Sequence, residues 1–470
     1  MTSQPPPVLQ PAAPLSPNTP PAAPTDPPAR PHPGSKARIG WIVAGSLITG
    51  LVAALLLAAA PFVPAEESAV TGALLCGFAL GWAMVAVLSV RFTDQPQRWA
   101  AAPALLMGSG GLLLVTFGSS VQAVLNWVWP PAVLALAIWM IVRIRRQLRS
   151  RSARWLLNLV VGVLVLASIG GGYEVVREAM DARAYPMPGR LIDVGGHRLH
   201  LSCTGSGSPT VVLEPGAGAM SSALGWIAPA VARDTRVCVY DRAGRGWSEP
   251  ADASQDGLQI AADLHTLLQR GQVPGPYVLM GHSFGGLYVL TFAARYPDEV
   301  AGMVLIDSTA PASGELATAS PGDQTSYDVT ARVSALASSS ARLGLGRVFA
   351  TLAASGLPPR FRDEVSAKMA TAASVRSTID EYAHAPAREA AALTDFANKP
   401  LVVLTAGSGH DAAETAAQNH LATLSTNSVH RVIAGATHAS LIAEQRDAAA
   451  TTRAVLDVAS SVRSGEPLAR

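Results

Sequence analysis

The sequence predicts two regions, an all-helical membrane region followed by an α/β domain with a mostly parallel β-sheet. Three observations lead to this prediction. Apolar segments of roughly 20 residues, the length that crosses a bilayer, follow one another between residues 39 and 176. Beyond residue 189, short apolar strands alternate with helical patterns, as in parallel sheets covered by helices on both faces. At one of these strand–helix junctions stands a serine flanked by glycines, Ser283.

The composition narrows the class of protein. Of the 470 residues 49% are hydrophobic and only 14% are charged, and the net charge is +2. This balance gives no indication of nucleic-acid binding. Three cysteines are too few for a disulfide framework or a cysteine-based zinc site.

The N-terminus is proline-rich. Thirteen of the 35 prolines lie within the first 33 residues, so we expect residues 1–38 to form a disordered, extended arm. It is not expected to be a signal peptide, because the apolar segment that follows comes too late and is too long.

Residues 39–173 are predicted to be a transmembrane helical region. Its five apolar segments are Ile39–Phe62, Ala69–Val90, Trp99–Phe117, Val121–Val142 and Trp155–Tyr173. The alternative, five buried helices of a soluble core, is poor because soluble cores rarely stack such segments with so few charges. The region reads as an anchor, since no intramembrane carboxylate or lysine signals an ion pathway.

The loops between these segments alternate in charge, which indicates orientation. Arginines and lysines precede the first segment and fill the second and fourth loops. The first loop instead carries Glu66 and Glu67, and the third, at residues 118–120, is uncharged. We therefore expect a cytoplasmic N-terminus and, after an odd number of spans and a linker at residues 174–188, an extracytoplasmic α/β domain. This topology depends on the short hairpin at 118–120.

The α/β domain is predicted over residues 189–464. Its first element is a hairpin, "GRLIDVGGHRLHLSCTG", with a turn at Gly195-Gly196. Further strands are predicted in "PTVVLEPGAGA", "TRVCVYDRAGRGWSE", "YVLM", "AGMVLIDS", "PLVVLTAG" and "SVHRVIAGATH". Between them, "GLQIAADLHTLLQRGQV" has the apolar spacing of a helix.

Gly281-His282-Ser283-Phe284-Gly285 fits G-x-S-x-G, the sharp turn that joins a strand to a helix and exposes a nucleophilic serine. The turn is expected to hold Ser283 Oγ above the sheet at a helix N-terminus, where free N–H groups favour a developing negative charge. Two backbone N–H groups are needed for that charge, and Phe284 and Ala217 are the expected donors.

A serine hydroxyl is a poor nucleophile until a base takes its proton. His438, in "IAGATHASL", is the expected base because the histidine comes last in this chain order. Two residues remain open for the acid that orients it. Asp411, after "PLVVLTAGSGH", is favoured, and Asp307, which ends "GMVLID", is the alternative. His410 is expected to be an exposed neighbour.

Residues 189–464 resemble the α/β-hydrolase superfamily in its esterase- and lipase-like branch. The motifs "YDRAGRGWS", "GHSFGG" and "GATH" come in the family order, although Pro215-Gly216 stands where the family usually has His-Gly. The resemblance implies an eight-stranded, mostly parallel sheet and a helical cap inserted at about residues 308–399. It also makes the strands of Cys203 and Cys238 neighbours, so these residues can form a disulfide outside the cytoplasm, or else remain two buried thiols.

The cap contains an apolar run that includes Leu343, Leu345 and Val348. We expect these side chains to pack onto the core, with a surface toward the substrate or the bilayer as the alternative.

Together these features predict a membrane-anchored serine hydrolase that cleaves a small-molecule or lipid-like carboxylic ester through an acyl-enzyme, without a metal or an organic cofactor. Two alternatives stay open. The same triad can serve an acyltransferase or an aminopeptidase-like amide hydrolase. In the other, a hydrolase fold serves as a non-catalytic membrane sensor or binding module.

Overall fold

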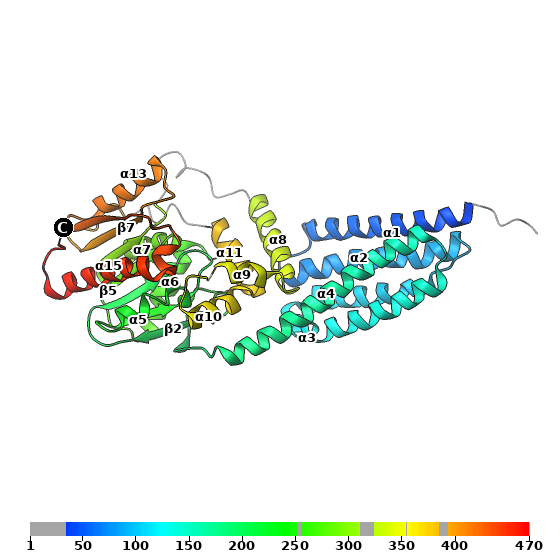
Figure 1. Cartoon of the computed structure of the whole chain (residues 1–470), viewed down its shortest axis with the longest axis horizontal. Helices are drawn as coiled ribbons and strands as arrows, with labels where there is room; N and C mark the ends of the chain where they lie inside the picture. Colours follow the sequence, from blue (N-terminus) through cyan, green and yellow to red (C-terminus); the bar gives the residue numbers. More distant parts are fainter. Residues whose placement is uncertain (1–33, 252–254, 311–323, 354, 385–392, 470) are drawn as a thin grey trace, which may run out of the picture.

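The computed structural model describes residues 34–251, 255–310, 324–353, 355–384 and 393–469. A bundle of long helices and an α/β part lie end to end, with a group of shorter helices between them (Figure 1). Most of the proline-rich arm expected over residues 1–38 lies outside the described residues.

The bundle is formed by α1 (Gly34–Ala59), α2 (Glu67–Phe92), α3 (Ala101–Gln147) and α4 (Arg151–Ala184). Within the described residues, these four helices are long and apolar enough to cross a membrane. Helix α4 continues to Ala184, so the first part of the expected linker at 174–188 is helical.

Helix α3 explains why the structure has four helices where five spans are predicted. At 47 residues it would be roughly 70 Å long if straight, more than twice the hydrocarbon thickness of a bilayer. Its backbone is instead non-helical at Gly118 (φ 59°, ψ −139°). A Cβ on Gly110 would overlap the ring of Trp129, so the two limbs lie side by side. The chain therefore reverses at the predicted hairpin.

Glycines let α1 and α2 approach closely. A Cβ on Gly77 would overlap the backbone of Ala54, and one on Gly50 would lie 2.7 Å from the Cα of Gly81. Small residues at such contacts are typical of membrane helices, because lipid supplies no hydrophobic force that drives helices together.

The α/β part contains the predicted eight-stranded sheet, in the order β1-β2-β4-β3-β5-β6-β7-β8. The β1–β2 and β2–β4 pairs are antiparallel, and all other pairs are parallel. The strands are β1 (Arg190–Asp193), β2 (Arg198–Thr204), β3 (Thr210–Glu214), β4 (Val237–Tyr240), β5 (Tyr277–His282), β6 (Val300–Ile306), β7 (Leu401–Ala406) and β8 (Ser428–Ile433). A disulfide joins Cys203 of β2 to Cys238 of β4.

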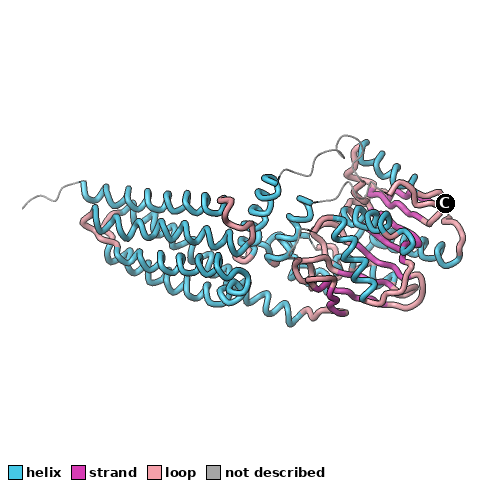
Figure 2. The backbone as a smooth tube through the Cα atoms, turned by 180° about the vertical axis from the view of Figure 1, so that it is seen from behind, coloured by secondary structure: helices cyan, strands magenta, loops and turns pink. Residues whose placement is uncertain are grey.

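Helices cover both faces of this sheet, as the alternating pattern predicts (Figure 2). One face packs against α6 (Gly257–Arg270), α7 (Phe284–Arg295) and the end of α13 (Ala412–Leu421). The other packs against α5 (Ala228–Val231), α14 (Ser440–Ala443) and α15 (Gln445–Ser464). Leu264 of α6 and Val458 of α15 are fully buried, so each face has its own apolar core.

The helices between bundle and sheet form the cap. They are α8 (Gln324–Ala341), α9 (Gly346–Ala353), α10 (Pro359–Met369) and α11 (Ala372–His384). The cap is tied to the bundle by ion pairs of Arg342 with Glu67 and of Arg347 with Glu174 and Asp181. The cap therefore contacts the helical bundle, and Glu381 of α11 contacts the α/β part by accepting from the N–H of Gly218.

Candidate active site

Ser283 lies at the junction of β5 and α7, in the strained conformation that the motif predicts (φ 55°). Close backbone contacts explain the glycines around it. A Cβ on Gly281 would lie 2.5 Å from the carbonyl oxygen of Gly285, and a Cβ on Gly285 would lie 2.5 Å from that of Glu214. The Ser283 N–H donates to the carbonyl of Ile306, which fixes the turn to β6.

Asp307 follows the last residue of β6 and is the carboxylate that contacts His438. Its Oδ2 accepts a hydrogen bond from His438 Nδ1 at 2.6 Å, and its Oδ1 accepts one from the N–H of Ala406 at 2.9 Å. The carboxylate is only 1% exposed. Burial alone would raise its pKa, but the hydrogen bonds from His438 and Ala406 outweigh that effect and lower the pKa below its ordinary value.

Asp411, the acid favoured from sequence, has a different role in the structure. Its Oδ1 accepts from the N–H of Glu414 at 2.8 Å, and Glu414 Oε2 accepts from the N–H of Asp411 at 2.9 Å. This is a capping box at the start of α13. The contacts therefore replace Asp411 with Asp307 as the partner of His438. The D-x-x-E pattern at residues 411–414 is the local signal that would have indicated a cap.

His410 also differs from the sequence expectation of an exposed neighbour. Its side chain is 17% exposed, and its Nε2 lies 3.0 Å from Asp307 Oδ1. Asp307 thus contacts two histidines, one through each carboxylate oxygen. His410, His438 and Asp307 line one pocket together with Ser408, Gly409, Glu414 and Thr437.

His282, the residue before Ser283, contacts both the ring and the backbone of His438. Its Nε2 lies 3.1 Å from the carbonyl oxygen of His438, and the two rings are 4.5 Å apart. A carbonyl only accepts, so His282 Nε2 carries the hydrogen. Burial, together with the neighbouring His438, lowers the pKa of His282 to about 4, which keeps the ring neutral.

These contacts place His438 beside the residue that precedes Ser283. In the described part of the chain, Ser283 Oγ and His438 Nε2 make no hydrogen bond, and the His438 side chain is 51% exposed. Hydrogen bonds between a nucleophile and its base are often loose in the absence of substrate.

The loop after β3 lies against Ser283. A Cβ on Gly216 would be 3.0 Å from Ser283 Cβ and 3.1 Å from His282 Nδ1, so a larger residue here would push on the serine turn. Ala217 is the next residue of this loop. Phe284 is the first residue of α7, where backbone N–H groups have no partner within the helix.

A buried network of charged side chains contacts the loop after β3, at residues 215–218. Arg242 donates to the carbonyls of Pro215 (2.9 Å) and Gly216 (2.8 Å) and pairs with Glu214. Burial raises the pKa of Glu214 to about 7.

The cap supplies the second carboxylate of the network. Glu381 of α11 accepts from the N–H of Gly218 at 2.7 Å and pairs with Arg242 (2.5 Å) and Arg245 (2.9 Å). Burial opposes its ionisation, but the two arginines outweigh burial and lower the pKa of Glu381. The sequence analysis missed this network, although both arginines stand in "YDRAGRGWS".

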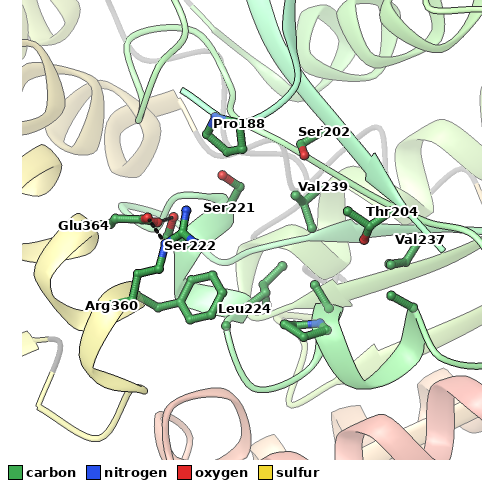
Figure 3. Close-up of a pocket in the computed structure, with 15 residues that line it drawn as sticks. Pro188, Ser202, Thr204, Ser221, Ser222, Leu224, Val237, Val239, Arg360 and Glu364 are labelled. Carbon is green, nitrogen blue, oxygen red and sulfur yellow. Dashed lines mark hydrogen bonds and ion pairs between the residues drawn. The ribbon is translucent and has the colours of Figure 1, made fainter. Parts of the chain in front are cut away.

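A second pocket lies over β2 and β4, between α5 and α10 (Figure 3). Two of its lining residues are bonded to each other, since Ser222 donates to Glu364 of α10 at 2.7 Å. Ser283, Asp307 and His438 do not line this pocket, so we do not assign it to the same site.

The chain also matches known proteins. Residues 209–444, half of the chain, match the model of the alpha/beta hydrolase fold family, and the protein therefore belongs to that family. It is 32% identical over 213 residues to an uncharacterised protein of Schizosaccharomyces pombe, covering 39% of this chain and 37% of that protein.

A second relative is the 2-hydroxymuconate semialdehyde hydrolase of a Pseudomonas species, 32% identical over 129 residues (26% of this chain, 44% of that protein). The chain thus spans less than half the length of either relative. Among solved structures, an esterase of Thermogutta terrifontis superposes with a TM-score of 0.43 at 22% identity, covering 57% of this chain and 94% of that one. The family supports a hydrolase.

Proposed function

We propose that the protein is a membrane-anchored serine hydrolase that cleaves carboxylic esters. The observation that carries this proposal is the Asp307–His438 hydrogen bond beside the strained Ser283 turn. The pairing gives the imidazole a fixed tautomer, with the hydrogen on Nδ1 and a free Nε2 that can accept a proton.

In the proposed mechanism, Ser283 Oγ attacks the ester carbonyl carbon while His438 Nε2 takes the hydroxyl proton. Asp307 stabilises the imidazolium that forms. The N–H groups of Ala217 and Phe284 bind the negatively charged carbonyl oxygen. His438 then gives the proton to the leaving alcohol, and water, activated by the same imidazole, releases the acid from Ser283.

The membrane part of the proposal rests on the four apolar helices and the charges of their loops. Six arginines lie between residues 143 and 154, at the junction of α3 and α4. The opposite end of the bundle, where Glu66 and Glu67 begin α2, has the cap against it. By the positive-inside rule, the arginine-rich end is cytoplasmic and the hydrolase part is extracytoplasmic.

A membrane-impermeant fluorophosphonate applied to intact cells tests both claims. It should label the wild-type protein and fail to label Ser283→Ala. Labelling that appears only after cell lysis would refute the orientation. Equal labelling of Ser283→Ala would refute the assigned nucleophile, and absent labelling before and after lysis would refute the hydrolase mechanism.

A further inference from the structure

The cap exposes an apolar surface at the end of the bundle. Val329, Val333 and Leu336 are exposed at the i, i+4, i+7 spacing that forms one stripe along α8. Leu343 and Leu345, in the turn that leads to α9, are exposed as well. Exposed large hydrophobic side chains that gather in one place mark an interaction surface.

Hydrogen bonds hold α8 across the outer end of α1 and α2 (Figure 1). Arg332 donates to the carbonyl of Ala58 in the last turn of α1 (2.7 Å) and to those of Ala60 (3.0 Å) and Val63 (2.8 Å) in the loop that follows. One turn before α9, Arg342 pairs with Glu67 at the start of α2. The middle of α8 and the residue after its last turn are thereby held at the level where the apolar helices end.

The apolar surface of α8 and its turn adjoins the lipid-facing surface of the bundle. Near the same end, α1 and the loop after it expose Leu55, Leu56 and Phe62, and α4 exposes Ile169 and Tyr173. A Cβ on Gly170 of α4 would overlap the carbonyl of Leu343, so the turn after α8 touches α4 directly.

Helix α8 is also connected to the region of Ser283, through contacts with α11. Ser334 of α8 donates to the carbonyl of Arg376 of α11 at 3.2 Å. At the other end of α11, the ring of Tyr382 lies 5.2 Å from the ring of Phe284, the residue after Ser283. Among the described residues, α8 and α11 thus link the end of the bundle to the residue after the candidate nucleophile.

We propose that α8 and the turn after it lie in the outer surface of the bilayer and that the enzyme takes its substrate from that leaflet. The substrate class is then an amphiphilic ester with a long acyl chain. This inference rests on the proposed function. A helix that lies in the membrane plane binds the interface through its apolar face, which is the arrangement of the exposed stripe.

The position of α8 is tested with full-length protein in phosphatidylcholine vesicles. An environment-sensitive fluorophore is attached to Val333→Cys or Leu345→Cys in a Cys76→Ala background, because Cys203 and Cys238 are in a disulfide. Val432→Cys is the matched control, since this valine of β8 is 60% exposed, close to the 52% of Val333. Spin-labelled lipids should quench positions 333 and 345 but not 432. Equal quenching at the three positions, or none, overturns the proposal.

The substrate class is tested by comparing a p-nitrophenyl palmitate held in vesicles with p-nitrophenyl butyrate in solution. Val333→Asp should lower the rate on the vesicle-held ester about tenfold and change the rate on the soluble ester less than about twofold. Val432→Asp should change neither. An unchanged rate of Val333→Asp on the vesicle-held ester, or an equal loss on both esters, overturns the proposal.

Ser283→Ala separates this inference from the proposed function. If Ser283→Ala hydrolyses the soluble ester as fast as wild type, the proposed function is refuted, while the quenching still reports where α8 lies. If Ser283 is required for the soluble ester but quenching is absent, only the membrane inference is refuted.

Discussion

The helical bundle and the α/β part are both closely packed, but their surfaces are opposite. The bundle exposes large apolar side chains along its length, such as Leu56, Leu105 and Leu166, and uses glycines where helices touch. The α/β part buries its apolar side chains on two sheet faces and keeps arginines and carboxylates either outside or in paired networks. This contrast suits a bilayer around the bundle and water around the α/β part. The cap between them has both exposed apolar side chains, such as Val333, and buried ion pairs, such as that of Glu381 with Arg242.

The largest expected effect concerns catalysis by the α/β part, through the carboxylate that contacts His438. Asp307→Asn should lower kcat on a soluble ester about 10⁴-fold, because the amide no longer holds the tautomer of His438 or stabilises its charge. Steady-state hydrolysis in detergent checks this.

The matched control is Asp411→Asn, the other carboxylate that the sequence offers. It should keep kcat within about twofold and cost at most about 1 kcal/mol through the cap of α13. If Asp411→Asn rather than Asp307→Asn removes activity, the assignment of the acid is wrong.

A second prediction concerns acid stability of the α/β part. The pKa of His282 is about 4 in the folded protein, below its ordinary 6.5, so between these values the unfolded chain binds a proton that the folded chain does not. The neutral, buried His282 therefore makes the free energy of unfolding depend on pH by an amount on the order of 3 kcal/mol. This stability is complete above pH 6.5 and is lost as the pH falls toward 4.

His282→Gln keeps a donor for the His438 carbonyl but cannot titrate. Thermal unfolding in detergent from pH 7 to pH 4 should therefore be less pH-dependent than in wild type. His420→Gln, at an exposed position of α13, should leave the wild-type profile unchanged. A His282→Gln profile that matches wild type would contradict the low pKa.

A third test lies at the border between cap and sheet. Glu381→Gln should lower kcat about 10²-fold with little change in KM, because Gly218 and both arginines lose their shared anion and the loop that carries Ala217 is less fixed. Glu364→Gln is the control, a buried cap glutamate bonded to Ser222 instead. Equal losses in both variants would mean that the cap matters only for stability.

The smallest expected effect belongs to the bundle. Gly77→Ala places a Cβ against the backbone of Ala54 and should destabilise the α1–α2 pair by about 1–3 kcal/mol. Gly45→Ala, where a Cβ meets nothing within 4 Å, should not. Unfolding midpoints in detergent report the difference, and equal midpoints would show that α1 and α2 are not closely packed there.

The sequence is informative where structure is decided locally. The glycines around Ser283, the strand–helix alternation and the apolar segments each depend on neighbouring residues, so the fold and the serine turn follow from them. The reversal in α3 was also predicted from residues 118–120.

Contacts between residues far apart in the sequence could not be predicted in this way. Asp307 and His438 are 131 positions apart, and choosing Asp307 over Asp411 requires the order of β6, β7 and β8 in space. Glu381 reaches Gly218 from 163 positions away. No periodicity or motif joins such pairs, and the sequence analysis accordingly favoured the aspartate that proved to cap α13.

The turn at Gly118 has a consequence for the compartment of the whole hydrolase part. If the bundle spans the bilayer as proposed, the chain crosses five times with this turn and would cross four times with one continuous α3. An even number would return Cys203 and Cys238 to the reducing side, where cellular thiols work against disulfides. On this topology, a single glycine with a positive φ decides the redox environment of a bond formed more than 80 residues later.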